Sequence, residues 1–207
     1  MFNELMKRYA ALSVCAEDIK SAEALLIETF ERGGKLLLAG NGGSSADCDH
    51  IVGELMKGFL KMRPLPEDKK REMKANFADI DESVLLKLQR GLPAVSLSSA
   101  SALNTAFSND IDADLVFAQG VLGLGRAGDA LIAISTSGNS RNVCHAARVA
   151  RALGIKVIAL TGECGGALGE IANVTVRVPE KETFKVQELH LPVYHYLSAA
   201  VEEHFFG

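Results

Sequence analysis

The feature that most constrains the fold is a regular alternation of short apolar runs with longer segments of helical spacing. Five runs are rich in β-forming residues: Lys35–Gly40, Pro93–Ser98, Asp129–Ser135, Lys156–Thr161 and Val174–Val178. Several are continuously apolar, such as "ALIAIS" and "KVIAL", as is typical of strands covered on both faces. Repeated strand–helix units predict a parallel sheet with helices on both sides. We therefore expect a three-layer α/β/α fold around a five-stranded parallel sheet.

Both ends of the chain carry helical patterns that such a sheet does not need. The spacing predicts one long amphipathic helix from about Asn3 to Arg32, ended by Gly33-Gly34, and another over about Thr183 to Phe206. An amphipathic helix must bury its apolar face. We expect these two helices to form a subunit interface; the alternative is that they cover the faces of the sheet.

Composition and charge exclude several classes of protein. The chain has 207 residues, 48% hydrophobic and 23% charged, which fits one globular domain over residues 1–207. A net charge of -4 argues against a general nucleic-acid surface. No apolar run approaches the ~20 residues of a membrane span. The first residues do not resemble an export signal, so we expect a cytoplasmic protein without a membrane partner.

The four cysteines suggest reduced thiols, because they form no CxxC pair and no regular framework. Cys144 stands next to His145, but neighbouring residues of a helix face different ways. We expect that pair to be structural.

Residues 61–92 interrupt the alternation of strands and helices. Two prolines and a dense run of charges predict a loop followed by one or two short helices. The basic cluster Lys69-Lys70-Arg71 is surrounded by Glu67, Asp68 and Glu72, which favours a solvated face over an anion site.

Two glycine-bearing loops follow predicted strands at the edge where parallel sheets bind ligands. Asn41-Gly42-Gly43-Ser44-Ser45 follows the first strand, and "STSGNS" (135–140) follows the third. Backbone N–H groups, hydroxyls and helix N-termini at such loops attract anions. Neither loop matches the nucleotide-binding glycine motifs, so a single phosphate on a small molecule suits them better. Ordinary helix capping is the alternative.

His50 and Glu54 are four residues apart in a predicted helix and share a face. Imidazole and carboxylate at this spacing make half of a divalent metal site. A simple helix-surface pair is the alternative.

Four segments together resemble the sugar isomerase (SIS) domain family, and within it the bacterial phosphoheptose isomerases. They are "GNGGSSADCDHIVGEL", "SND" (108–110), "STSGNS" and "VQELHLPVYH" (186–195). The resemblance spans nearly the whole chain, and it implies a single SIS domain with a flavodoxin-like sheet, in a homotetramer. It further implies an enzyme of heptose biosynthesis that converts sedoheptulose 7-phosphate to D-glycero-D-manno-heptose 7-phosphate.

The resemblance also implies site residues. One zinc ion per active site would be held by His50, Glu54, Gln187 and His195, of which Glu54 and His195 would also be catalytic. The residues implied for substrate binding are Asn41, Gly42, Gly43, Ser44, Asn109, Asp110, Ser135, Thr136, Ser137, Ser140 and Gln187.

The chemistry of isomerisation suits these residue types. Aldose–ketose conversion moves a proton between C1 and C2 through an enediol, so it needs a base, an acid and a group that stabilises the enediolate. Glu54 is the candidate base and His195 the candidate acid. A metal ion would polarise the carbonyl, and the loops would orient the substrate by its phosphate.

The chain departs from the family in three places. Phe184 stands where these isomerases usually have an aspartate, residues 61–92 are longer than the usual connection, and Pro192 interrupts the last helical pattern. Two other classes remain open: a non-catalytic SIS tetramer that binds a phosphosugar or a protein such as a replication initiator, and a lyase or etherase of amino sugar phosphates. The initiator-associating relatives lack the catalytic glutamate and final histidine, so the presence of Glu54, His195 and Ser137 favours the isomerase.

The last helix raises two further expectations. Of its histidines, the resemblance assigns function to His195, and we expect His190 to be a structural neighbour of the sheet. Gln187 and His195 are ~12 Å apart along a straight helix. They could meet one metal ion only by reaching toward each other along the axis or if Pro192 bends the helix; the alternative is that one ligand comes from a neighbouring chain.

Overall fold

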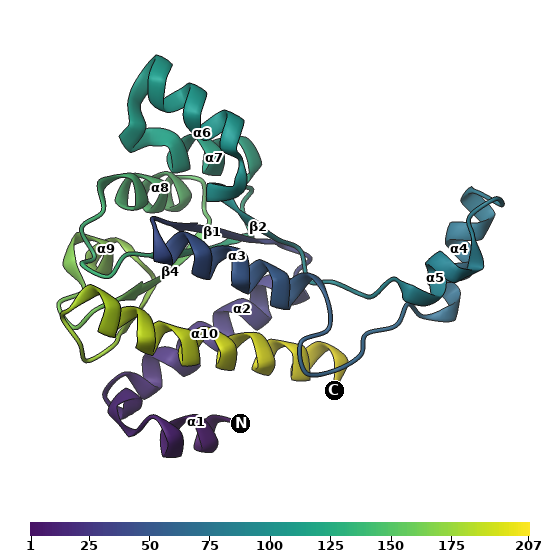
Figure 1. Cartoon of the computed structure of the whole chain (residues 1–207), viewed down its shortest axis with the longest axis horizontal. Coiled ribbons are helices and arrows are strands. Elements are labelled where there is room, and N and C mark those ends of the chain that lie inside the picture. Colours follow the sequence, from purple (N-terminus) through teal and green to yellow (C-terminus); the bar gives the residue numbers. More distant parts are fainter.

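The computed structural model describes residues 1–207 and has a five-stranded, entirely parallel sheet at its centre (Figure 1). The strands are β1 (Leu36–Gly40), β2 (Ala94–Ser96), β3 (Ala130–Ile134), β4 (Lys156–Thr161) and β5 (Val174–Arg177). Their order is β2-β1-β3-β4-β5, that of a flavodoxin-like sheet. All five predicted strands and the predicted fold class are confirmed.

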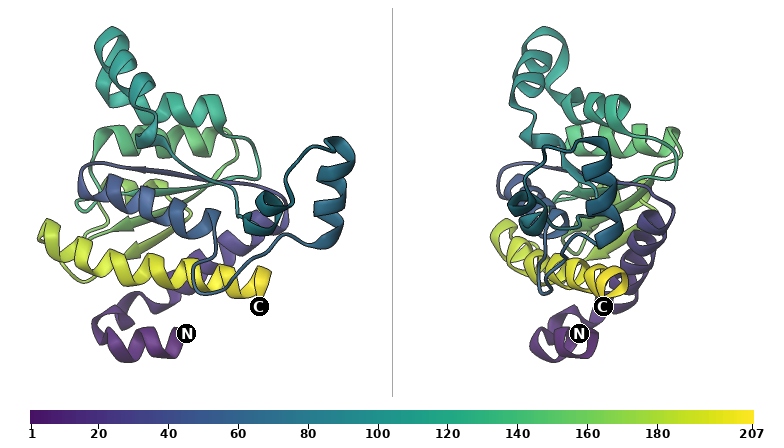
Figure 2. Two further views of the ribbon diagram at one scale, coloured as in Figure 1. Left: turned by 45° about the vertical axis from the view of Figure 1, so that its right-hand side comes forward. Right: turned by 90° about the vertical axis from the view of Figure 1, so that its right-hand side faces the viewer.

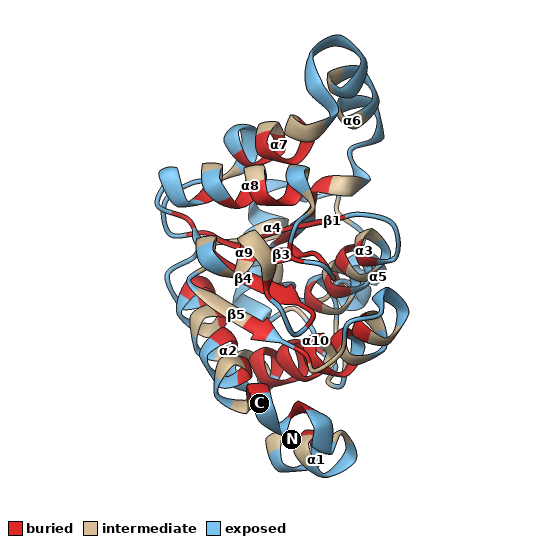
Figure 3. Cartoon of the chain, turned by 90° about the vertical axis from the view of Figure 1, so that its left-hand side faces the viewer, coloured by how far each residue is buried: buried red, intermediate tan, exposed pale blue.

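Helices cover both faces of the sheet, because alternate residues of each strand point to opposite sides. Leu36 and Leu38 belong to a core with α2 (Ala16–Glu31), α3 (Gly43–Met56) and α10 (Thr183–Phe206). Leu37 and Ala39 belong to a second core with α7 (Val116–Leu124), α8 (Arg141–Ala152) and α9 (Gly166–Ile171). Figure 3 shows the buried residues concentrated in the sheet and on the helix sides that face it.

The prediction of one long N-terminal helix is wrong. The segment divides into α1 (Phe2–Arg8), a 3-10 helix η1 (Ala10–Cys15) and α2, with a break at Tyr9, whose φ of -125° and ψ of 66° are not helical. The break lets α1 turn onto α10, where the rings of Phe2 and Tyr196 meet edge to face. Apolar spacing did not reveal it, because the three-residue step from Leu12 to Cys15 suits both kinds of helix.

The C-terminal helix has the predicted bounds. α10 runs from Thr183 to Phe206 through Pro192 and packs against α2 and α3 (Figure 1). Much of α10 is buried within this single chain. α2 and α10 thus cover one face of the sheet, as the alternative expectation held.

Two segments project from the layered body. One contains α6 (Ser101–Phe107), the π-helical η3 (Ser108–Asp112) and the 3-10 turn η4 (Ala113–Leu115), following η2 (Leu97–Ser99). The other, the arm, contains α4 (Glu67–Asn76) and α5 (Glu82–Lys87), and it extends away from the sheet (Figures 1 and 2). The predicted loop with two short helices is confirmed.

Lys69 and Arg71 of the arm's basic cluster are exposed, as expected, whereas the side chain of Lys70 is only 13% exposed. Lys69 pairs with Glu72 at 2.9 Å and Lys70 with Glu67 at 2.7 Å, both within α4, which has no buried residue. No helix of the chain is long and apolar enough to span a bilayer.

The cysteines are all free, and Cys15, Cys48 and Cys144 are buried. Burial raises the pKa of the Cys15 thiol to about 11 and also raises that of Cys144. Buried thiols of raised pKa are unreactive, so the structural interpretation of Cys144 holds.

Candidate active site

The two glycine-bearing loops meet, because β1 and β3 are neighbours and Gly40 pairs with Ile134 at their carboxyl ends. A cavity of about 250 Å³ lies between the loops and α10, and we name it the loop cavity. It is lined by Asn41, Gly42, Gly43, Ser44, Ile134, Ser135, Thr136, Ser140, Thr183 and Gln187. Eight of the predicted substrate-binding residues therefore surround one space.

Glycine is required where α3 begins at this cavity. Gly42 precedes the helix with a φ of +55°, a conformation that favours glycine. A Cβ on Gly43 would stand 2.5 Å from Nε2 of Gln187. The absence of a side chain at Gly43 thus lets α10 approach the N-terminus of α3, where the N–H groups of Gly42 and Gly43 have no backbone partner.

The second loop is held by its own hydroxyls. The hydroxyls of Ser135 and Ser140 are 2.9 Å apart, and the backbone N–H of Ser140 donates to Ser135. Ser137 is exposed and does not line the cavity; its hydroxyl accepts a bond from the N–H of Asn139. Of the predicted serines, Ser137 is thus the one outside the cavity.

A link between the loops was missed from the sequence. The side-chain amides of Asn41 and Asn142 exchange two hydrogen bonds, each of 2.9 Å. Nothing in the spacing of two residues 101 positions apart could have revealed this contact.

A second group of predicted residues, His50, Glu54 and His195, also comes together in one chain. Nε2 of His50 is 3.2 Å from Oε1 of Glu54, whose side chain is 14% exposed. The rings of His50 and His195 meet edge to face, with centroids 5.0 Å apart. Oε2 of Glu54 also pairs with Lys57 at 3.2 Å. The shared face of His50 and Glu54 is confirmed, and His195 lies beside them.

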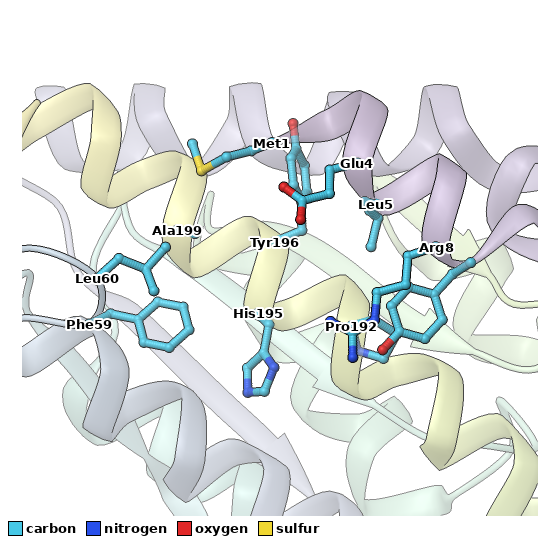
Figure 4. A pocket seen from close by; sticks show the side chains of 11 residues that line it. Met1, Glu4, Leu5, Arg8, Phe59, Leu60, Pro192, His195, Tyr196 and Ala199 are labelled. Atoms are coloured by element: carbon cyan, nitrogen blue, oxygen red, sulfur yellow. The ribbon is translucent and has the colours of Figure 1, made fainter.

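His195 opens onto a second cavity, of about 330 Å³, between α1, α10 and the loop at Phe59. Figure 4 shows its imidazole extending from α10 beside Phe59, and the two ring centroids are 5.6 Å apart. Burial lowers the pKa of His195, and the neighbouring His50 lowers it further, against the opposing effect of Glu54. His195 is therefore held toward its neutral form.

A metal ion fits part of this group. Two ligands of a tetrahedral zinc ion with bonds of about 2.0–2.2 Å stand about 3.3–3.5 Å apart, close to the 3.2 Å between His50 and Glu54. These two donors therefore have the spacing of half of such a site. No three histidine, cysteine or acidic side chains converge closely enough to hold an ion. His195 is the nearest third donor, and Gln187 lines the loop cavity instead.

His190 is the structural neighbour of the sheet that we expected. It is fully buried, and its Nε2 lies 3.3 Å from the carbonyl oxygen of Thr161 at the end of β4. Burial lowers its pKa to about 4. It touches neither cavity.

Asn109 and Asp110 do not join the other predicted residues. They lie exposed in η3 on the projecting segment, where the amide of Asn109 donates to Asp110 at 2.8 Å. Within one chain they line neither cavity.

The structure adds two residues behind His50 that sequence reasoning missed. The hydroxyl of Tyr194 lies 3.0 Å from Nδ1 of His50 and donates to Oδ1 of Asp47 at 3.2 Å. Asp47 precedes His50 by three residues in α3, so a shared helix face was the only available signal.

Comparison with known proteins assigns the chain to one family. An SIS domain family model matches residues 84–162. The chain is 38% identical over 182 residues to the phosphoheptose isomerase of Trichlorobacter lovleyi, covering 88% of this chain and 80% of that one. It is 37% identical over 196 residues to the phosphoheptose isomerase of Helicobacter pylori, covering 94% and 88%.

Solved structures agree with the sequence comparison. The phosphoheptose isomerase of Neisseria gonorrhoeae superposes with a TM-score of 0.76 at 32% identity, covering 98% of this chain and 95% of that one. The phosphoheptose isomerase of Francisella tularensis gives 0.77 at 29% identity, covering 98% and 94%. At these identities over most of both sequences, the chain belongs to the phosphoheptose isomerase family of SIS-domain proteins.

Proposed function

We propose that the chain is an aldose–ketose isomerase that interconverts sedoheptulose 7-phosphate and D-glycero-D-manno-heptose 7-phosphate through an enediol. One observation carries the proposal: the loop cavity and the group of His50, Glu54 and His195 both lie beside α10. This helix contributes Gln187 to the cavity and His195 to the group. The relatives named phosphoheptose isomerases support it. They do not favour a non-catalytic binding protein.

The loop cavity binds the substrate phosphate. The N-termini of α3 and α8 adjoin its two loops and supply the positive ends of their helix dipoles, and the N–H groups of Gly42 and Gly43, which have no protein partner, are available as donors. The hydroxyls of Ser135 and Ser140 add donors. A phosphate held there fixes which carbons of the sugar reach the reacting residues.

The spacing along α10 suits a long sugar. Gln187 lines the loop cavity and His195 follows eight residues later, which is ~12 Å of helical rise. A substrate must therefore carry its phosphate and its carbonyl at opposite ends of an extended carbon chain. A heptose 7-phosphate meets this requirement better than a three-carbon phosphosugar.

Proton transfer falls to Glu54 and His195. The poorly exposed carboxylate of Glu54 takes the proton from C2 of the aldose, or from C1 of the ketose, and returns it to the other carbon. His195 gives a proton to the carbonyl oxygen as negative charge develops there, and it takes one back from the neighbouring hydroxyl as the new carbonyl forms. Because both residues lie beside His50, the base and the acid can act on one enediol.

We propose zinc as the cofactor, with His50 and Glu54 as its first two ligands. When bound, it supplies a Lewis acid that polarises the substrate carbonyl. His195 remains a proposed ligand on the family resemblance, and Gln187, ~12 Å away along α10, would reach the ion only from a neighbouring chain. A homotetramer and a cytoplasmic location are proposed on the same basis.

The test is to incubate the purified protein with sedoheptulose 7-phosphate in heavy water and to follow the products by NMR. We expect an aldoheptose phosphate with deuterium at C2. Glu54→Gln should abolish both isomerisation and exchange, whereas Asp49→Asn, on the exposed side of α3, should retain them. Near-normal exchange in folded Glu54→Gln would remove Glu54 as the base, and no turnover by the wild type would refute the proposed activity.

A further inference from the structure

We propose that Tyr194 and Asp47 are positioning residues that hold the His50 imidazole with its Nε2 lone pair directed at a cation shared with Glu54. The proposal rests on the proposed function, because it concerns the metal half-site of that isomerase. It assigns a role to a tyrosine and an aspartate that themselves touch neither cavity.

The tyrosine hydroxyl has one hydrogen, which it donates to Asp47 in a hydrogen bond. Tyr194 is 1% exposed, and its hydroxyl donates to Oδ1 of Asp47 at 3.2 Å. A hydroxyl whose hydrogen is engaged can only accept further bonds. With the hydroxyl hydrogen on Asp47, Nδ1 of His50, 3.0 Å away, carries a hydrogen and donates it to Tyr194.

This arrangement leaves a lone pair at Nε2 of neutral His50, and Nε2 faces Oε1 of Glu54 at 3.2 Å. Two acceptors at that distance repel each other unless a proton or a metal ion lies between them. The separation is close to the edge of a zinc tetrahedron, about 3.3–3.5 Å for bonds of about 2.0–2.2 Å. Tyr194 and Asp47 thus orient His50 so that its Nε2 and the carboxylate of Glu54 can share a cation.

No other hydrogen bond restrains the His50 ring. Besides Tyr194 and Glu54, the ring that it meets is that of His195, edge to face with centroids 5.0 Å apart. Without the tyrosine hydroxyl, the neutral ring would gain a hydrogen bond by carrying its hydrogen on Nε2, which would then donate to Glu54. That tautomer presents no lone pair to a metal ion. Residues behind a metal-bound histidine commonly set its orientation and tautomer in this way.

Tyr196 offers a matched control. It lies two residues further along α10, and its hydroxyl donates to Glu23 of α2 rather than to any residue of the half-site. Tyr196→Phe therefore removes a buried hydroxyl from the same helix without touching His50.

The experiment compares Tyr194→Phe, Tyr196→Phe and the wild type after removal of metal. Zinc affinity is measured by competition with a chromophoric chelator, and ¹⁵N–¹H correlation spectra report which ring nitrogen of His50 carries hydrogen. We expect the wild type and Tyr196→Phe to show the Nδ1–H tautomer. Tyr194→Phe should shift to Nε2–H and bind zinc about 10–100-fold more weakly.

Asp47→Ala gives an independent check. It frees the tyrosine hydrogen to donate to Nδ1, which inverts the tautomer, so it should weaken zinc binding at least as much as Tyr194→Phe. Circular dichroism establishes that each variant is folded.

An Nε2–H tautomer in the wild type, or equal zinc affinity in folded Tyr194→Phe and Tyr196→Phe, would overturn the proposal. The spectra need neither metal nor substrate. They can therefore contradict this assignment while the protein isomerises its sugar, or support it when no turnover is found.

Discussion

Nη2 of Arg63 lies 2.8 Å from Oε1 of Glu202 in the interior of the protein, where the two side chains are 0% and 1% exposed. The carboxylate also accepts bonds from the backbone N–H groups of three consecutive residues, Phe59, Leu60 and Lys61. These bonds, and the ion pair, lower the pKa of Glu202 although burial alone would raise it. Arg63 reaches further, to the carbonyl oxygens of Leu55 and Glu54 at the end of α3. One buried pair thus ties the loop beside His195 to the helix that carries Glu54.

Glu202→Gln should destabilise the protein by about 3–5 kcal/mol, because it leaves the buried guanidinium of Arg63 without its counter-charge. Urea unfolding followed by circular dichroism measures the loss. The neighbouring Glu203 pairs with Lys61 at 2.6 Å, but these side chains are 52% and 35% exposed. Glu203→Gln should therefore cost no more than about 1 kcal/mol. Equal losses in the two variants would show that the buried pair has no special role.

His190 should make the stability fall in mildly acidic solution. Its pKa of about 4 in the folded protein lies below its ordinary value of 6.5. Below pH ~6.5 the unfolded chain therefore binds a proton at this histidine that the folded protein does not bind. Stability is then lost as the pH falls from ~6.5 toward ~4, by at most about 1.4 kcal/mol per pH unit. The free energy of unfolding of His190→Gln should depend less steeply on pH over this range. Parallel curves for variant and wild type would contradict the prediction.

Gly43→Ala should weaken phosphosugar binding more than it changes stability. The added Cβ would stand 2.5 Å from Nε2 of Gln187 and would displace that side chain within the loop cavity. Gly53→Ala in the same helix is the control, because a Cβ there meets nothing within 4 Å. It should stabilise the protein by up to about 1 kcal/mol through helix propensity. Calorimetric titration with a phosphosugar and thermal unfolding separate the two effects, and unchanged affinity in Gly43→Ala would count against a substrate site there.

Ser140→Ala should raise the dissociation constant of a phosphosugar by the equivalent of about 1.5–3 kcal/mol, the usual value of a hydrogen bond to a charged group. Ser137→Ala should have a smaller effect, because the Ser137 hydroxyl lies outside the loop cavity and accepts a bond from Asn139. Calorimetry on both variants checks the order. If Ser137→Ala proves the more harmful, the loop must rearrange when substrate binds.

The fold was predictable where local pattern and burial coincide. β1 and β3 are buried at every position, so their apolar runs carry no polar interruption that could mislead. α10 keeps helical spacing over its whole length, and its bounds followed from the pattern despite Pro192. His50 and Glu54 could be paired because helix geometry alone brings them together.

The remaining contacts join residues that only the tertiary fold makes neighbours. Asn41 meets Asn142, and Arg63 meets Glu202, across separations of 101 and 139 positions. Tyr194 is adjacent in sequence to His195, yet its hydroxyl bonds residues of α3. Periodicity says which face of a helix is apolar, but it does not say which helix lies opposite.

The ends of the arm are held side by side, since the N–H of Arg90 donates to the carbonyl of Arg63 at 2.7 Å and Pro64 forms an antiparallel bridge with Gln89. A closed neck of this kind isolates the sheet from whatever lies beyond it. Evolution can lengthen, shorten or exchange residues 65–88 without disturbing strand pairing, and a short turn grafted between Pro64 and Gln89 would preserve the same closure. The arm is therefore the part of this chain where new recognition can be acquired at the lowest risk to the fold.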